Sequence, residues 1–154
     1  MILQGLLILL LTIMLLLMIT KQRNYTSSDI GMFTDNWIKA VTQDNDPKKV
    51  AGLFCHDANL VGTVSRTIRK GQDIERYFDY FAKLDGIRVL DKEYYITKVT
   101  DDVFINTAFV DWMWNDLPEP VTARMTFVFR NNCIYQLHSS VLPDFNVDLK
   151  KIAG

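Results

Sequence analysis

The sequence contains few of the residues that most often carry chemistry in protein sites. Of its 154 residues only two are cysteines, Cys55 and Cys133, and only two are histidines, His56 and His138. None of them falls in a metal-ligand spacing such as C-x-x-C, so we expect neither a metal site nor a bound cofactor. The cysteines are predicted to be free, partly buried thiols, and a long-range disulfide between them is the less favoured alternative.

An excess of charge of either sign is also missing. Seventeen lysines and arginines stand against eighteen aspartates and glutamates, which gives a net charge of -1. A chain this close to neutrality has no overall field that would attract a polyanion. We therefore expect no nucleic-acid partner.

Residues 1–20 contain no charged side chain at all. As a helix they would span roughly 30 Å, the thickness of the hydrocarbon core of a bilayer. No basic residue precedes the run and no small-residue cleavage site follows it, which favours an anchor over a cleaved signal peptide. We predict that residues 1–20 form a transmembrane anchor in a lipid bilayer.

The first charges after this run are Lys21 and Arg23. Basic residues accumulate on the cytoplasmic side of membrane spans. The sequence therefore predicts a single-pass membrane protein whose folded domain lies on the cytoplasmic, or topologically equivalent, side. Residues 21–28 would form a short juxtamembrane linker.

Helix signals fill the first half of the remaining chain. Apolar residues recur at steps of three and four over residues 29–43, which predicts an amphipathic helix. Its cap is expected to be Ser27, Ser28 or Asp29. A second helix should begin at Pro47 with Asp46 as its cap, and residues 73–84 should form a third.

Strand signals dominate from residue 87 onward. Four runs rich in β-branched and aromatic residues are separated by turn-forming residues, and they cover 87–100, 103–114, 121–130 and 133–141. Residues 57–71 are interpreted as two short strands or a strand and a bend. The sequence predicts an α+β domain over residues 29–145, with three N-terminal helices packed on a bent antiparallel sheet, and a C-terminal tail over 146–154.

Two stretches carry a resemblance to a known family. They are LFCHDANLVGTVSRTIRKGQDIERYFDYF at residues 53–81 and ARMTFVFRNNCIYQLHSSVLP at residues 123–143. Over about residues 30–145 the chain resembles the nuclear-transport-factor-2-like superfamily, and most of all the association domain of calcium/calmodulin-dependent protein kinase type II with its stand-alone bacterial and plastid relatives. Where those relatives have a His-His pair, this sequence has Leu137 before His138.

The resemblance implies a cone with a pocket between the helices and the concave face of the sheet. It also implies a tendency to form dimers or larger rings through the sheet. It does not imply one activity, because this fold hosts isomerases, dehydratases, transport factors and oligomerisation hubs.

A candidate ligand site follows from the pairing of the last two strands. A turn centred near Asn131 places Arg124 opposite Ser139 or Ser140 and close to His138. The resemblance places the matching arginine in the cone cavity, where a guanidinium group binds a carboxylate or another small anion well. We predict a ligand site formed by Arg124, His138, Ser140, Tyr77 and Trp112, with Tyr80 as a further possible wall. An Arg124 paired to Asp111 as a structural device is the equally favoured alternative.

Catalysis is the less favoured interpretation of the same residues. A Ser/His nucleophile pair is disfavoured, because His138 and Ser139 point to opposite faces of a strand and Ser140 lies about 7 Å further along it. Asp111 and His138 are weak candidates for a general base, and His56 is interpreted as a solvent-edge residue.

These observations favour a membrane-anchored, non-enzymatic assembly module. It would act as a homo-oligomer or as a subunit of a membrane complex in an organelle or a virus particle, since tethering raises the effective concentration of weakly interacting domains. The alternative is a binding protein for a small anion or carboxylate, or an isomerase-like or dehydratase-like enzyme, that uses the cone pocket.

Overall fold

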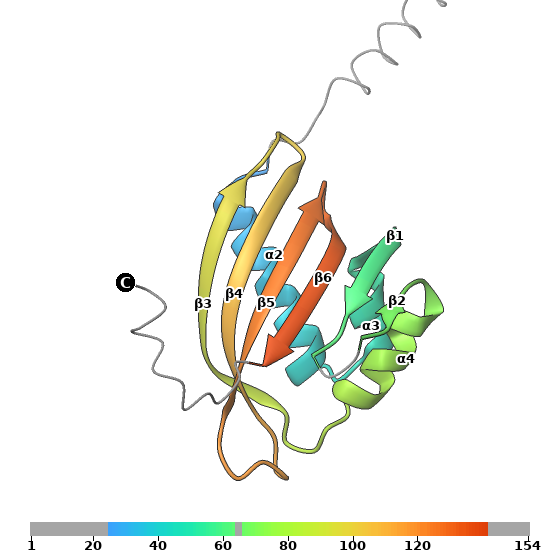
Figure 1. The fold of residues 1–154 in the computed structure, drawn as a ribbon, viewed down its shortest axis with the longest axis vertical. Helices are drawn as coiled ribbons and strands as arrows, with labels where there is room; N and C mark the ends of the chain where they lie inside the picture. The colour runs from blue at the N-terminus through green and yellow to red at the C-terminus, as the bar shows by residue number, and fades with distance from the viewer. Residues whose placement is uncertain (1–24, 64–65, 142–154) are drawn as a thin grey trace, which may run out of the picture.

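The computed structural model describes residues 25–63 and 66–141 (Figure 1). Within these residues helices precede and interrupt the first strands, and a run of four long strands follows. The elements in chain order are α2 (Ser27–Thr42), α3 (Pro47–Gly52), β1 (Phe54–Val61), β2 (Ile68–Arg69), α4 (Gln72–Phe81), β3 (Arg88–Lys98), β4 (Val103–Met113), β5 (Val121–Arg130) and β6 (Cys133–Val141).

The first helix begins two residues earlier than its apolar pattern indicates. Thr26 is the cap of α2, and its side chain accepts a hydrogen bond from the backbone N–H of Asp29 at 3.3 Å. The carboxylate of Asp29 accepts in turn from the backbone N–H of Thr26 at 2.8 Å. This reciprocal pair satisfies two backbone donors at the helix start, so the predicted capping by residues 27–29 was wrong.

The other two helices lie where the sequence places them. Asp46 caps α3 by accepting from the backbone N–H groups of Lys48 and Lys49, and Pro47 occupies the first turn, where its missing N–H has no cost. The third helix, α4, runs from Gln72 to Phe81, shorter at its end than the predicted 73–84.

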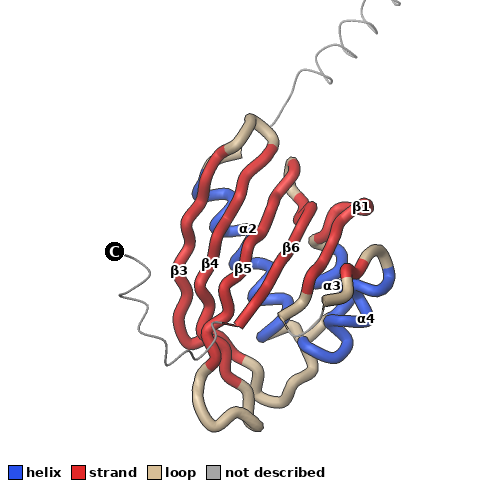
Figure 2. Tube along the Cα trace, viewed as in Figure 1, coloured by secondary structure: helices blue, strands red, loops and turns tan. Residues whose placement is uncertain are grey.

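One mixed sheet of six strands, ordered β2-β1-β6-β5-β4-β3, forms the other layer (Figure 2). The predicted antiparallel meander of β3, β4, β5 and β6 is confirmed. The expectation of a wholly antiparallel sheet was wrong, because β1 runs parallel to β6. The chain between β1 and β6 passes through β2, α4 and the first three strands of the meander. The relative direction of β1 and β6 depends on this path, which no local sequence pattern encodes.

Strict alternation decides which side chains meet the helices. On β4 every second residue is buried, from Phe104 to Trp112, and on β5 the buried residues are Ala123, Met125, Phe127 and Phe129. Successive side chains of a strand point to opposite faces, so their neighbours lie on the outer face of the sheet. The α2 helix crosses behind the inner face (Figure 1).

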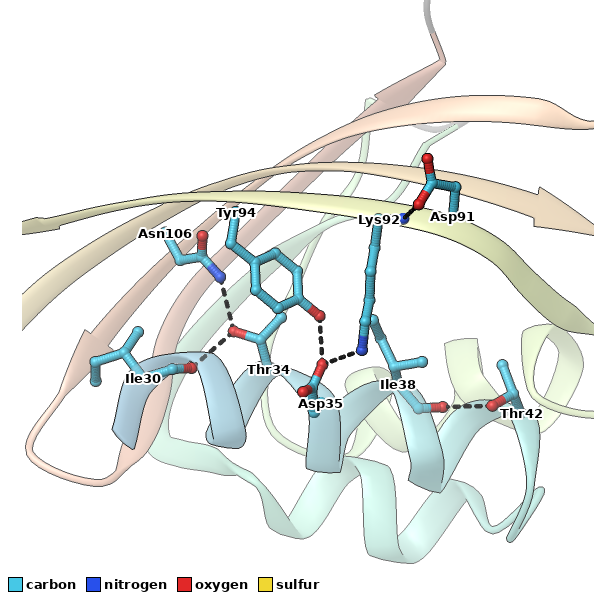
Figure 3. Close-up of polar contacts among 9 residues, drawn as sticks. All are labelled: Ile30, Thr34, Asp35, Ile38, Thr42, Asp91, Lys92, Tyr94 and Asn106. Atoms are coloured by element: carbon cyan, nitrogen blue, oxygen red, sulfur yellow. Dashed lines mark hydrogen bonds and ion pairs between the residues drawn. The ribbon is translucent and has the colours of Figure 1, made fainter. Parts of the chain in front are cut away.

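Polar contacts also join α2 to the sheet (Figure 3). The buried Asn106 of β4 donates from its side-chain amide to the hydroxyl of Thr34 at 2.8 Å, and that hydroxyl donates to the carbonyl of Ile30 at 3.0 Å. The next residue, Asp35, accepts from the hydroxyl of Tyr94 at 2.7 Å and pairs with Lys92. These contacts fix the position of α2 over β3 and β4.

A disulfide joins Cys55 at the start of β1 to Cys133 at the start of β6, with a Cα–Cα distance of 5.1 Å. The predicted free thiols were wrong. The two positions are far apart in the sequence, and only the parallel pairing of Phe54 with Ile134 brings them together.

The predicted anchor at residues 1–20, most of the linker at 21–28 and the tail at 146–154 lie outside the described residues. Among residues 25–63 and 66–141, none of the helices combines the length and apolar character needed to cross a bilayer.

Candidate ligand-binding cavity

A cavity of about 750 Å³ opens between α4 and the inner face of the sheet. Its walls come from α2, α4, the turn that follows β1, and every strand of the sheet except β3. It lies at the end of the sheet where β4 and β6 finish and β5 begins, which is the lower end in Figure 1. A volume of this size accommodates an organic molecule of drug size.

Aromatic rings form a large part of the wall. They are contributed by Trp37, Tyr77, Phe78, Tyr80, Phe81, Trp112 and Trp114. The buried ring of Trp37 packs edge to face against Phe78 and Trp112, with ring centroids 5.8 and 6.1 Å apart. Such contacts hold the rings in fixed orientations, so the wall presents a preformed apolar surface.

Hydroxyl groups gather at one side of this apolar wall. The hydroxyls of Thr63 and Ser139 lie 2.8 Å apart, and Ser139 is only 6% exposed. The ring of Tyr77 is adjacent to Gly62, where a Cβ atom would lie 2.6 Å from a ring carbon. Gly62 therefore provides the space in which Tyr77 reaches the hydroxyl pair.

The environment of Tyr77 keeps its phenol neutral. Burial raises the pKa of the Tyr77 hydroxyl above its usual value of 10.0, and hydrogen bonding to Thr63 and the charge of Arg69 offset part of that rise. A neutral phenol can both donate and accept, so this corner of the cavity suits a polar group of either kind.

Among the described residues that line the cavity, charged side chains occur only towards the rim. Arg69 of β2 is half-buried, and its guanidinium carbon lies 4.8 Å from the centroid of the Tyr77 ring. Asp73 and Arg76, on the exposed face of α4, pair with each other at 2.8 Å. Asp116 is exposed as well. The cavity is thus an apolar chamber with a hydroxyl corner and a charged rim.

The structure divides the predicted ligand residues between the two faces of the sheet. Tyr77 and Trp112 line the cavity, and so does Tyr80. Arg124 does pair with Ser140 in the β5–β6 register, but both alternate with cavity residues and lie on the outer face. His138 is exposed on that outer face too. The expected position of Arg124 in the cavity was therefore wrong.

The proton-transfer candidates also lie away from the cavity. Asp111 is on the outer face of β4, where it accepts a hydrogen bond from Thr122 at 2.6 Å. No ion pair joins it to Arg124 within the described part of the chain, so the predicted structural pairing does not form. His56 is exposed on β1, as expected of a solvent-edge residue.

The predicted ligand site lacks three polar residues of the cavity. It includes Ser140 rather than Ser139, and it contains neither Thr63 nor Arg69. The parity of the apolar residues in β5 carried the signal for Ser139: Met125 and Phe127 must face the core, and in the register Ser139 pairs with Met125. No comparable local signal marks Arg69, whose place at the rim depends on how β2 folds back on β1.

Comparison with known proteins identifies the fold. The sequence matches no family profile, and it matches no curated protein. A protein from Xanthomonas campestris assigned as a calcium/calmodulin-dependent protein kinase II association domain superposes with a TM-score of 0.67; it is 24% identical, and the match covers 80% of this chain and 93% of that one. A protein from Streptomyces avermitilis assigned as a dehydratase of the nuclear-transport-factor-2-like family gives 0.65, with 14% identity and coverage of 75% and 95%. A ketosteroid isomerase-like protein from Erwinia carotovora atroseptica gives 0.59, with 13% identity and coverage of 75% and 95%.

The chain has the nuclear-transport-factor-2-like fold. The fold implied by the resemblance of residues 53–81 and 123–143 is confirmed. Within this fold the cavity described above occupies the space between the helices and the concave sheet. A fold that hosts many activities does not specify one, so the function depends on the residues of this cavity.

Proposed function

We propose that this chain binds an apolar small molecule in the cavity between α4 and the sheet. The observation that carries the proposal is an open chamber of about 750 Å³ whose wall is largely apolar and includes the packed rings of Trp37, Phe78 and Trp112. Filling this volume would remove water from a large apolar surface, at a gain of roughly 25 cal/mol per Å². The hydroxyls of Thr63, Tyr77 and Ser139 would orient the ligand.

The charged residues favour binding over catalysis. A general base must reach the substrate from within the cavity, in an environment that tunes its pKa. Among the described residues lining the cavity the only carboxylates are Asp73 and Asp116, and both are exposed at the rim. Asp111 and His138 lie on the opposite face of the sheet. An isomerase-like or dehydratase-like activity therefore has less support than binding alone.

Fluorescence quenching of the full-length chain in zwitterionic lipid nanodiscs tests this proposal. Trp112 and Trp114 line the cavity, so addition of the neutral probe 2-naphthamide should quench their emission with a stoichiometry of one per chain. Ala123→Leu places a larger side chain on the cavity wall. It should weaken binding by about tenfold, because the added carbon atoms occupy volume that the ligand would otherwise fill.

The matched control is Arg124→Leu, at the adjacent residue of the same strand but on the outer face. The affinity of this variant for 2-naphthamide should stay within about twofold of that of the natural chain, because the substitution removes no contact with the ligand. If Arg124→Leu lost binding while Ala123→Leu retained it, the ligand would bind on the outer face, and the cavity would not be the binding site.

Self-association through the outer face of the sheet is a second candidate, and it retains the predicted assembly role. Acidic residues lie on the β3–β4 side of this face and basic or imidazole side chains lie on the β5–β6 side; the former are Asp91, Glu93 and Asp111, and the latter are Arg124 and His138. A twofold axis parallel to the strands would place each side over the opposite side of a second copy. The mass of the full-length chain in solution measures this association.

The membrane anchor at residues 1–20 and the compartment of the domain remain proposals. Lys21 and Arg23 favour the cytoplasmic side, whereas a disulfide such as Cys55–Cys133 persists in oxidising compartments. Alkylation of free thiols in protein isolated from its native membrane shows whether Cys55 and Cys133 are reduced or oxidised there. A reduced pair there supports the cytoplasmic side, and an oxidised pair contradicts it.

A further inference from the structure

We propose that the ligand of the cavity is a lipophilic acid, with its apolar body among the aromatic rings and its carboxylate against Arg69. This inference rests on the proposed binding function and deepens it. Three observations carry it: the state of Arg69, the hydroxyl groups beside it, and the contrast with the second arginine at the same rim.

Arg69 has no anionic partner in the described part of the chain. No carboxylate among these residues lies within the 4.0 Å of an ion pair from its guanidinium group. Among residues 25–63 and 66–141, the one side-chain hydrogen bond of Arg69 goes from a terminal nitrogen to the carbonyl of Thr67, at 3.2 Å. Since a guanidinium group carries five N–H donors, most of its donor capacity is available to a ligand.

Two contacts place Arg69 at the rim of the cavity. It pairs with Leu60 across the short β1–β2 ribbon, and Leu60 is a buried residue of the cavity wall. Its guanidinium group stacks over the ring of Tyr77, which holds the cation at the boundary between chamber and solvent. A carboxylate at this boundary keeps contact with water while the rest of the molecule is buried.

Hydroxyl donors lie on the cavity side of this cation. Thr63 is hydrogen-bonded to both Ser139 and Tyr77. The three hydroxyl groups therefore use two of their three protons among themselves, and one O–H is left to donate to a ligand oxygen. A carboxylate has several acceptor positions and so could accept from Arg69 and a hydroxyl group together.

The second arginine at this rim, Arg76, is already in an ion pair. It pairs with Asp73 at 2.8 Å, and both side chains are well exposed. An anion attracted to Arg76 would have to compete with a carboxylate already in place. Of the two rim arginines, Arg69 is therefore the one left to pair with a ligand anion, and it lies against Tyr77 of the hydroxyl corner.

The experiment compares two probes of nearly equal shape, 2-naphthoate and the neutral 2-naphthamide. Both are titrated into the full-length chain in zwitterionic nanodiscs, with tryptophan quenching as the readout. The natural chain should bind naphthoate about tenfold more tightly, the scale of a charge-assisted pair. Arg69→Gln should abolish this preference and leave naphthamide affinity within about twofold, whereas Arg76→Gln should preserve the preference.

The variant Arg69→Lys separates charge from geometry, because it keeps the cation and loses the planar fork. It should retain part of the preference for naphthoate. Equal binding of the two probes by the natural chain, or a preference that survives Arg69→Gln, would overturn the acid as ligand while leaving the cavity as a binding site. Absence of binding by either probe would instead overturn the proposed function itself.

Discussion

Gly62 determines how close one aromatic side chain can come to the polar corner of the cavity. A Cβ atom at this position would lie 2.6 to 2.9 Å from three atoms of Tyr77, including its hydroxyl oxygen. Real side chains do not approach so closely, so a larger residue here must displace the ring. The ring has little freedom to move, because Arg69 stacks on it and Phe81 packs parallel to it at 6.0 Å.

Gly62→Ala should therefore change binding as well as stability. Displacement of Tyr77 would separate its hydroxyl from Thr63 and intrude on the cavity, so we expect weaker binding of 2-naphthamide and a loss of about 1–3 kcal/mol of unfolding free energy. Quenching titrations and urea unfolding measure the two effects. Gly52→Ala is the matched control, since a Cβ there meets nothing within 4 Å. Equal effects of the two substitutions would contradict the steric account.

At the scale of elements, the contact between α2 and the sheet depends on a buried polar pair. Thr34 and Asn106 are both 0% exposed, and the hydroxyl of Thr34 is the only described partner of the Asn106 side chain (Figure 3). Removing one member of such a pair leaves the other desolvated without compensation, which costs more than the bond itself contributes.

Thr34→Val should accordingly cost about 1–3 kcal/mol of unfolding free energy, because the amide of Asn106 then has no partner. The double variant Thr34→Val/Asn106→Leu removes both polar groups and should be more stable than Thr34→Val alone. Urea unfolding of both variants checks the order. Thr42→Val, which loses a similar bond to Ile38 in a less buried place, should change stability by less than about 0.5 kcal/mol. A double variant no more stable than Thr34→Val would show that the pair does not control the contact.

The order of elements was largely accessible to sequence reasoning, because local chemistry encodes it. Asp46 and Pro47 predict the start of α3, and the turn at Asn131 sets the β5–β6 register. The direction of β1 and the disulfide of Cys55 were not accessible, since both depend on strands far apart in the chain. Arg124 is a different case: the alternation of Met125 and its neighbours indicates the outer face, whereas the resemblance implies a position in the cavity.

At the scale of the whole molecule, the outer face of the sheet offers a charge test of self-association. In the proposed twofold arrangement Arg124 of one copy would face the acidic β3–β4 side of the other. Arg124→Glu reverses that charge and should shift the full-length chain towards the monomer in light scattering. Lys39→Glu, an exposed charge reversal on α2 behind the sheet, should leave the mass unchanged. A natural chain that is monomeric at high concentration would refute this interface.

The Cys55–Cys133 disulfide also gives the domain a defined mechanical load path. Tension applied through Tyr25 and Val141 would run along α2 and α3 to Cys55, cross the sulfur bridge and leave along β6. Only the segments 25–54 and 134–141 could then be extended, by at most about 3.6 Å per residue. The residues between Cys55 and Cys133, which the disulfide closes into a covalent loop, carry no force. That loop contains α4, β2, β4 and most of the cavity wall, so an oxidised domain pulled from its ends would keep the greater part of its chamber intact.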